Sequence, residues 1–293
     1  MDMKVLVIGG TGYIGSAVYR HLTEAGIVVD TVDQELRGNR INGRNVRCDF
    51  QHLTASFLAD YPTIILLAGH SNVRQAVTDP YGAFDNNLVS FKNLLSKLRD
   101  QRLIYASSSS IYTGVGGQVV DESWKTFNFM NMYDFSKYAC DAVSSLLYRN
   151  FYALRFGTVN GPSENLRLDL MINRMVWSGL TRGKVQMSNP RVRRPILGIT
   201  DLCRTVEAIA NGPDTPGIYN VASFNTTVEE AAEAVAAAIG CPIERLPDGP
   251  TYDFTMQVKK LTDVFGIEPR QTLASLIEDL VAYHREHDLR NFE

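Results

Sequence analysis

The sequence has few cysteines, no long apolar run and no excess of charge of either sign. Its four cysteines are scattered among 293 residues without the short spacings of metal or redox motifs, which favours free thiols in a reducing compartment. The longest apolar run, 64–69, is far below the roughly 20 residues needed to cross a bilayer. A formal net charge of −3 gives no reason to expect nucleic acid as a partner.

The termini also lack recognisable signals. The opening stretch "MDMKVLVIGG" passes directly into an expected strand and has no secretory n-region or h-region. His284 and His287 form an HxxH pair near the other end, but no further ligand candidates lie nearby, so a solvated helix end is favoured over a metal site. We therefore expect a cytoplasmic protein that holds no metal and binds neither membrane nor nucleic acid.

What the chain does contain is an alternation of apolar strands and helical stretches. The predicted strands are near-continuous apolar runs, as expected where helices cover both faces of a parallel sheet, and they lie at 4–8, 27–32, 45–48, 63–68, 102–106 and 151–156. The helical stretches between them lie at about 13–25, 51–60, 73–98 and 132–150. This order predicts an α/β fold with a Rossmann-type doubly wound parallel sheet.

The first predicted strand leads into a glycine-rich loop with a GxxGxxG pattern at Gly9, Gly12 and Gly15. Glycines at this spacing allow a tight turn, a close approach of the backbone to a pyrophosphate, and close packing of helix on strand. The following helix offers free N–H groups and partial positive charge to the phosphates. A purely structural turn would give the same letters, but the position between a strand and a helix favours a dinucleotide site.

Asp33 closes the second predicted strand, about 20 residues beyond the loop. A carboxylate there accepts hydrogen bonds from the adenosine ribose and repels a 2′-phosphate, which favours NAD over NADP. Arg37, Arg40 and Arg44 follow, and one of them could instead receive a 2′-phosphate. We predict NAD as the cofactor, with NADP as the alternative.

After Gly161-Pro162 the pattern becomes less regular, with turn signals and helical stretches at about 200–211, 227–239 and 272–288. No repeat or low-complexity linker separates the two halves. We expect an NAD-binding domain over 1–160, with a return segment at about 196–215. A smaller α/β substrate-binding region would comprise 161–195 and 216–293.

The order of motifs resembles the extended short-chain dehydrogenase/reductase family, in particular its NAD-dependent nucleotide-sugar epimerases and dehydratases, typified by UDP-galactose 4-epimerase. The similarity covers nearly the whole chain. Besides the glycine loop, its segments are "LAG" at 67–69, "DNN" and "NLL" within 85–95, "YASSSSIYTG" at 105–114, "YDFSK" at 133–137, "LRFGTVNGP" at 154–162, "RRPILGITDL" at 193–202 and "GIYNVAS" at 217–223.

The resemblance implies that Ser108, Tyr133 and Lys137 are catalytic. Tyr133 and Lys137 are four residues apart and so share a helix face, although this spacing alone could be accidental. A nearby ammonium lowers the pKa of a phenol from its usual value of about 10. Tyr133 could then take a proton from a sugar hydroxyl while hydride leaves the carbon, with Ser108 orienting the same oxygen. Ser109 remains an alternative to Ser108.

The resemblance also implies binding residues. The expected cofactor contacts are Gly9, Gly12, Tyr13, Ile14, Gly15, Asp33, Asp49, Phe50, Leu67, Ala68, Gly69, Asn86, Tyr133 and Lys137. The expected substrate contacts are Ser108, Ser109, Thr158, Asn165, Leu166 and Arg194, with Arg194 at the diphosphate. Three departures leave the sugar open. Thr158 replaces the usual Asn, Gly198 stands where His is common, and "GPTYD" at 249–253 lacks a second phosphate arginine, for which Arg245 is the candidate substitute.

We therefore expect an NAD-dependent nucleotide-sugar epimerase that inverts C4 through a transient 4-keto sugar. Dehydratases of the resembled family carry an acidic pair after the catalytic Ser/Thr, where this chain has Ser109 and Ser110, so a 4,6-dehydratase is less favoured. A 4-dehydrogenase or 4-ketoreductase would use the same three residues, and a non-catalytic NAD(H)-binding sensor is the rival from another class. The expected partner is a nucleoside-diphosphate sugar, and the resemblance implies a homodimer formed through 73–98 and 132–150.

Overall fold

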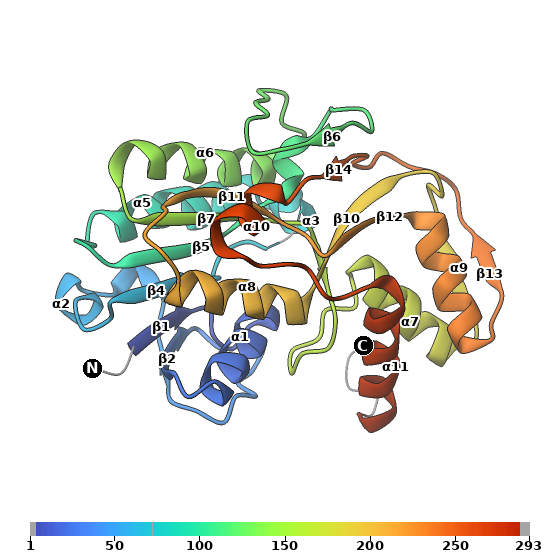
Figure 1. The fold of residues 1–293 in the computed structure, drawn as a ribbon, viewed down its shortest axis with the longest axis horizontal. Coiled ribbons are helices and arrows are strands. Elements are labelled where there is room, and N and C mark those ends of the chain that lie inside the picture. Colours follow the sequence, from blue (N-terminus) through green and yellow to red (C-terminus); the bar gives the residue numbers. More distant parts are fainter. Residues whose placement is uncertain (1–3, 72, 288–293) are drawn as a thin grey trace.

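The computed structural model describes residues 4–71 and 73–287, and its centre is a seven-stranded sheet between layers of helices (Figure 1). All neighbouring strands pair in parallel, in the order β11-β7-β5-β4-β1-β2-β3. The strands are β1 (Lys4–Ile8), β2 (Val28–Asp33), β3 (Asn45–Arg47), β4 (Thr63–Leu66), β5 (Arg102–Ser108), β7 (Phe151–Phe156) and β11 (Gly217–Val221). The predicted Rossmann-type sheet is thereby confirmed.

Strand β1 shows why the central strands are apolar at every position. Val5 and Val7 belong to the core cluster that contains α1 and α8, whereas Leu6 and Ile8 belong to the cluster on the opposite face. All four side chains are at most 1% exposed. Burying each of them contributes about 1.5–3 kcal/mol relative to exposure, so both faces of the strand stabilise the sheet.

Helices α1 (Tyr13–Glu24) and α8 (Ile199–Asn211) cover one face, and α5 (Ser90–Leu95) and α6 (Met132–Leu147) cover the other (Figure 1). The stretch 73–98 is broken into α3 (Val73–Thr78), α4 (Pro80–Phe84), the π-helical turn η2 (Asp85–Val89) and α5. Pro80 has no N–H for a preceding helix, and Asp79 caps the new one by accepting the Gly82 N–H at 2.9 Å. The stretch 51–60 is likewise divided into η1 (Phe50–His52) and α2 (Ala55–Leu58).

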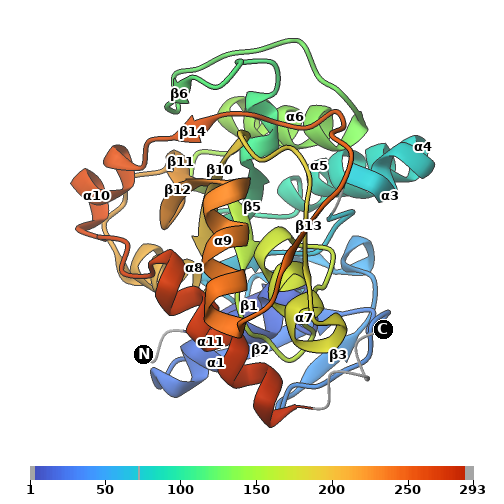
Figure 2. The same cartoon turned by 90° about the vertical axis from the view of Figure 1, so that its right-hand side faces the viewer.

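The smaller region, which faces the viewer in Figure 2, contains α7 (Met171–Arg182), α9 (Val228–Ile239) and α11 (Leu273–Glu286), which pack against one another. Its short strands are β6 (Val119–Val120), β8 (Thr158–Asn160), β9 (Val185–Met187), β10 (Arg193–Gly198), β12 (Phe224–Thr227), β13 (Ile243–Arg245) and β14 (Thr255–Met256); η3 (Ser109–Tyr112) and α10 (Lys259–Phe265) complete the elements. Strand β11, which the sequence pattern grouped with this region, pairs with β7 at the edge of the main sheet. In residues 4–71 and 73–287, every helix is too short or too polar to cross a bilayer.

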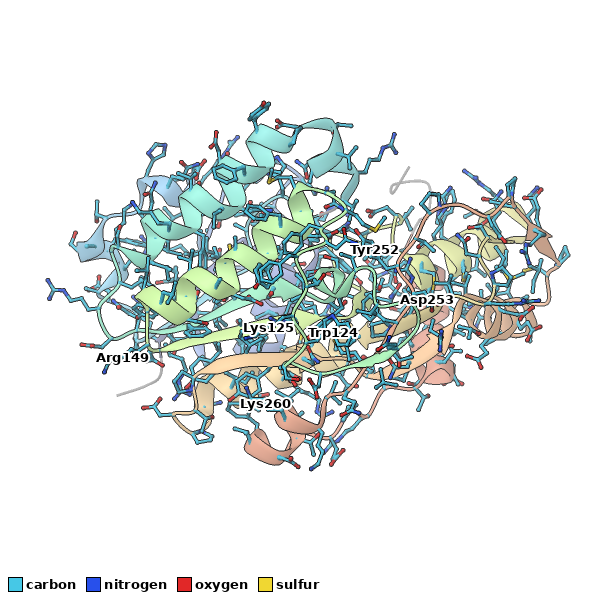
Figure 3. The ribbon with its side chains drawn as sticks, turned by 90° about the horizontal axis from the view of Figure 1, so that it is seen from above. Trp124, Lys125, Arg149, Tyr252, Asp253 and Lys260 are labelled. Atoms are coloured by element: carbon cyan, nitrogen blue, oxygen red, sulfur yellow. The ribbon has the colours of Figure 1, made fainter. Side chains whose placement is uncertain are left out.

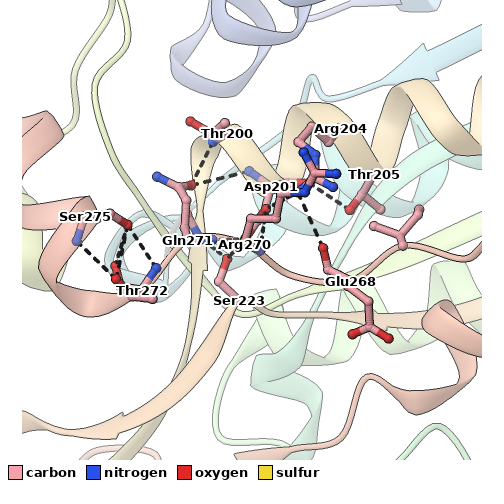
Figure 4. A network of polar contacts seen from close by, with 12 residues as sticks. Thr200, Asp201, Arg204, Thr205, Ser223, Glu268, Arg270, Gln271, Thr272 and Ser275 are labelled. Atoms are coloured by element: carbon pink, nitrogen blue, oxygen red, sulfur yellow. Dashed lines mark hydrogen bonds and ion pairs between the residues drawn. The ribbon is translucent and has the colours of Figure 1, made fainter.

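A buried polar network joins the carboxy-terminal segment to the start of α8 (Figure 4). The Gln271 side-chain oxygen accepts the N–H groups of Thr200 at 3.0 Å and Asp201 at 3.3 Å. The Asp201 carboxylate in turn accepts the Gln271 N–H at 2.9 Å. A Cβ at Gly198 would lie 2.0 Å from the same Gln271 oxygen, so a larger side chain there would push Gln271 out of this network. Gln271 therefore accounts for glycine at this departure from the resembled family.

Candidate active site

The loop between β1 and α1 is pressed against the end of β4. Gly9 has a φ of +93°, and a Cβ there would lie 2.5 Å from the Ala68 nitrogen. A Cβ at Gly15 would lie 1.9 Å from the Gly9 carbonyl oxygen. Gly12 precedes α1 without any side-chain cap, so the first N–H groups of the helix are available to an anionic ligand.

A cavity of about 260 Å³ opens beside this loop. Asp33 lies on its wall, where its carboxylate accepts the N–H groups of Thr11 at 3.2 Å and Glu35 at 2.8 Å. Its remaining lone pairs can accept from ribose hydroxyls. Arg37 borders the same cavity, whereas Arg40 donates to the Glu164 carbonyl. An uncapped helix terminus and a fixed carboxylate on one cavity fit the pyrophosphate and ribose of a dinucleotide.

Most of the other predicted cofactor contacts border this cavity: Gly9, Gly12, Tyr13, Ile14, Gly15, Phe50, Leu67, Ala68, Gly69 and Asn86. Asp49 is placed differently. It caps η1 by accepting the Gln51 N–H at 3.0 Å and also accepts the Gln34 amide at 3.1 Å. Asp49 therefore supports the cavity through Gln34, which borders it.

Sequence reasoning missed Asn87, which positions the loop after β4. The Asn87 side chain accepts the His70 N–H at 2.7 Å and donates to the Ser136 hydroxyl at 3.1 Å. Gly69, with a φ of +146°, makes the close approach to Asn87 possible. The buried amide thus joins the loop to α6, and the Asn86-Asn87 pair in the sequence was the only local sign of it.

A larger cavity of about 590 Å³ adjoins the first and shares Tyr13, Leu67 and Gly69 with it. Tyr133 and Lys137 reach it from α6, which begins where the Asn131 side chain accepts the Asp134 N–H at 3.1 Å. The Lys137 ammonium donates to the Ala106 carbonyl at 2.8 Å and lies 5.7 Å from the centre of the Tyr133 ring. The ammonium is therefore held close to the phenol.

Ser108 enters the same cavity from the end of β5. Its hydroxyl accepts the Ser110 N–H at 3.1 Å and donates to the Ser110 hydroxyl at 2.9 Å. Ser109 is also buried and borders the cavity. The structure thus brings Ser108, Tyr133 and Lys137 to one cavity from two different elements.

Another wall of this cavity carries a partly buried cation. Arg194, on β10, hydrogen-bonds the Thr251 hydroxyl and lies 5.6 Å from the centre of the Tyr252 ring. Its neighbour Arg193 forms an ion pair with Asp253 at 3.2 Å, but no carboxylate within residues 4–71 and 73–287 pairs with Arg194. Burial lowers the pKa of Arg194. Because a guanidinium still stays protonated, this wall presents a positive charge that an anion can neutralise.

Arg167 borders both cavities and was not expected from the motifs. It makes two hydrogen bonds to Asp169, at 3.0 and 2.6 Å, and donates to the Ser71 carbonyl at 3.3 Å. The pair therefore connects the loop after β4 with the segment before α7. In the sequence, the Arg167-x-Asp169 spacing is the only local indication of this pair.

Some of the remaining predicted substrate residues border the larger cavity and others do not. Thr158 borders the larger cavity. Asn165 donates to the Thr11 carbonyl of the glycine loop and Leu166 is buried in the core, and neither is among the residues that border the two cavities. Arg245 forms an exposed ion pair with Asp248 at 3.0 Å. At the GPTYD departure, Tyr252 instead reaches the cavity wall beside Arg194.

The chain matches the model of the NAD dependent epimerase/dehydratase family over residues 5–222. Protein CapI of Staphylococcus aureus is 30% identical over 244 residues, which cover 73% of this chain and 71% of CapI. The structure of MoeE5 in complex with UDP-glucuronic acid and NAD is similar with a TM-score of 0.86 and 24% identity, covering 97% of this chain and 99% of MoeE5. The Thermus thermophilus UDP-glucose 4-epimerase in complex with NAD gives a TM-score of 0.83 at 24% identity, with the same coverage. The two solved structures share the fold of this chain.

Proposed function

Because the chain belongs to the NAD-dependent epimerase/dehydratase family, we propose that it inverts C4 of a nucleoside-diphosphate sugar. The observation that carries this proposal is the junction of two cavities. One is bordered by the glycine loop and Asp33, and the other by Ser108, Tyr133 and Lys137. A redox cofactor and an alcohol can therefore meet beside a proton acceptor.

The cofactor proposed is NAD. The family is NAD-dependent, and both solved structures named above hold NAD. The Asp33 carboxylate supports NAD over NADP, because a 2′-phosphate at that place would face a negative charge. NAD held beside the glycine loop and Asp33 would supply reversible hydride transfer to either face of the sugar carbon.

The residues of the larger cavity then have separate tasks. Tyr133 takes the proton of the C4 hydroxyl and gives it back after the keto sugar has turned. Lys137, held 2.8 Å from the Ala106 carbonyl, keeps its positive charge beside the phenol and stabilises the phenolate. Ser108 binds the same sugar oxygen. Arg194 holds the diphosphate while the sugar turns, because its partly buried guanidinium borders this cavity and has no carboxylate partner among the described residues.

Two related reactions differ from epimerisation, one in the residues that it needs at the cavity wall and the other in the amount of cofactor that it consumes. A dehydratase needs an acid beside the sugar, and Ser109 and Ser110 supply only hydroxyls at the cavity wall. A 4-dehydrogenase or 4-ketoreductase would use the same three catalytic residues but would consume one cofactor per turnover. An intact set of Ser108, Tyr133 and Lys137 disfavours a non-catalytic NAD(H) sensor.

The test is turnover without added cofactor. Purified protein is analysed for bound NAD and incubated with UDP-glucose, UDP-galactose and UDP-glucuronic acid, and epimers are separated by chromatography. We expect interconversion of one pair without added NAD. The Tyr133→Phe variant should keep its NAD and lose turnover by about 10²- to 10⁴-fold. Stoichiometric use of NADPH, or undiminished turnover in Tyr133→Phe, would contradict the proposal.

We also propose a homodimer formed through the helices of 73–98 and 132–150. Exposed apolar side chains on the packed helices α4 and α6 support it: Tyr81 is 85% exposed, Leu146 83% and Leu147 65%. Light scattering should give twice the 32.7 kDa chain mass, and Leu146→Lys should lower the measured mass toward that of one chain.

All four cysteines are free, which supports a reducing, cytoplasmic location.

A further inference from the structure

Tyr252 borders the larger cavity beside Arg194, but the mechanism above gives it no task. It lies on the chain segment that leads into β14 (Figure 3), within the GPTYD departure from the resembled family. Its hydroxyl donates to the Asp134 carboxylate at 3.1 Å and accepts the Asn131 amide at 3.0 Å. The single proton of the phenol and one of its lone pairs are therefore both used at the start of α6, 118 residues away in the sequence.

The start of α6 is fixed by the same three residues. The Asn131 side chain caps the helix by accepting the Asp134 N–H at 3.1 Å, and its amide group donates to the Asp134 carboxylate at 3.0 Å. Asp134 is fully buried in the first turn, where the partial positive charge of the helix N-terminus favours an anion. Tyr133, the proposed proton acceptor, is the preceding residue. Tyr252 therefore closes a hydrogen-bonded unit that includes the turn carrying Tyr133.

The ring of Tyr252 contacts the proposed diphosphate anchor. The Arg194 guanidinium lies 5.6 Å from the centre of this ring, and it hydrogen-bonds the hydroxyl of Thr251, the preceding residue. A guanidinium is attracted to the face of an aromatic ring, and its planar shape lets it stack there. Thr251 and Tyr252 thus hold the guanidinium, while Tyr252 is itself held by α6.

Stability alone does not account for this arrangement. The buried Asp134 carboxylate accepts hydrogen bonds from neutral groups, and the partly buried Arg194 has no carboxylate partner among the described residues. Charges that are shielded from water without a counter-ion disfavour folding. One tyrosine contacts both of these charged side chains. Because the arrangement disfavours folding, we looked to the proposed reaction for its role.

We propose that Tyr252 is a positioning residue, which fixes the span from the proton acceptor Tyr133 to the diphosphate anchor Arg194. This proposal rests on the proposed function, in which the sugar turns while its diphosphate stays bound. After the turn, the keto carbon has to return to its place beside Tyr133. A fixed span brings it back, because a displacement of about 1 Å can cost about 10²-fold in rate. Tyr252 acts through Arg194 and Asp134.

The span is tested in the Tyr252→Phe holoenzyme with the UDP-sugar that the wild type converts. Phenylalanine keeps the ring beside Arg194 and removes the bond to Asp134, so KM should stay within about threefold while kcat falls about tenfold to 10²-fold. A keto sugar that is misplaced after turning escapes. Each escape leaves one oxidised sugar in solution and one NADH on the protein. The absorbance of NADH should therefore rise during turnover in Tyr252→Phe and stay flat in the wild type.

Tyr61→Phe is the matched control, because the Tyr61 hydroxyl also donates to a carboxylate, that of Asp30 at 2.8 Å, and Tyr61 borders neither cavity. It should lower stability and leave kcat, KM and NADH absorbance unchanged. Asp134→Ala breaks the same link as Tyr252→Phe, so it should reproduce the rise of NADH. Combining the two should lower kcat no further than the larger single effect. Absence of NADH accumulation in Tyr252→Phe would overturn the proposal, whatever the change in kcat.

A readout without sugar turnover separates the span from the proposed function. In the wild type, UDP should slow amide hydrogen exchange at 133–137, because a diphosphate on Arg194 restrains Tyr252 and through it the start of α6. Tyr252→Phe should bind UDP with a Kd within about threefold of the wild type and lose this protection. If UDP binds but protects 133–137 equally in both proteins, or in neither, the span is overturned even in an active epimerase. A wild type that binds no UDP would overturn the span and the proposed diphosphate site together.

Discussion

Replacing Arg194 with methionine should weaken substrate binding without weakening the fold. The guanidinium is partly buried at the wall of the larger cavity, hydrogen-bonds Thr251, and has no carboxylate partner in the part of the chain that the structure describes. A buried charge without a counter-ion costs free energy of folding, whereas its contact with a diphosphate contributes to binding. One substitution should therefore move stability and affinity in opposite directions.

The structure sets the size of both effects. Truncating one partner of a buried charge pair costs about 2–5 kcal/mol, so the Kd for UDP should rise at least 30-fold. Methionine keeps most of the packing against Tyr252, so the free energy of unfolding should stay level or rise by about 1 kcal/mol. Arg193→Met is the matched control, because Arg193 is exposed and its ion pair with Asp253 is worth about 0–1 kcal/mol.

Isothermal titration with UDP and urea unfolding of the same samples measure the two quantities. Arg193→Met should bind UDP as the wild type does and unfold at the same or slightly lower urea concentration. If Arg194→Met binds UDP normally and unfolds more easily, Arg194 is a structural residue and the charge argument is refuted.

Three further outcomes follow from the described contacts. Gly15→Ala should weaken NAD binding about tenfold or more in calorimetry, because its Cβ would overlap the Gly9 carbonyl oxygen. The control Gly249→Ala should leave NAD binding unchanged, because nothing lies within 4 Å of its Cβ. Asp33→Ser should shift the ratio of NAD to NADP affinity toward NADP by about tenfold, since Arg37 borders the same cavity. Burial lowers the pKa of His284 from 6.5 to about 4, so below pH 6.5 the unfolded chain binds a proton that the folded chain does not bind. The free energy of unfolding should therefore be highest above about pH 6.5 and fall by about 1–2 kcal/mol toward pH 4. His284→Phe should flatten this pH dependence, measured by urea unfolding.

The parts of this molecule that could be predicted from its sequence are those set by neighbours in the chain. The central strands were recognisable because both of their faces are buried, as Val5 and Leu6 show on β1. The glycine loop was recognisable because Gly15 packs against the backbone of Gly9 in the same loop, although Gly9 itself is required by Ala68, which is far away in the sequence. The break at Asp79-Pro80 is also a local signal, and it was missed because the surrounding residues keep a helical pattern.

The parts that could not be predicted depend on residues far apart in the sequence. Tyr252 meets Asp134 across 118 residues, and no spacing rule connects them. Gln271 occupies the space above Gly198, which sequence comparison alone could only record as a departure. Asn165 has the right position in the chain to reach a substrate, but its amide is used by the glycine loop.

The bond between Gln271 and the start of α8 limits how this chain can be cut or recombined. The family model ends at residue 222, yet the first amides of α8 are satisfied by a side chain about 50 residues beyond that point. Cutting the chain after β11 would expose those amides and the Asp201 carboxylate together. A chimera with a relative would have to exchange 198–201 and 268–271 as one unit. The motifs of the proposed cofactor site therefore all lie in one part of the sequence, but the folding of that part depends on the carboxy-terminal segment.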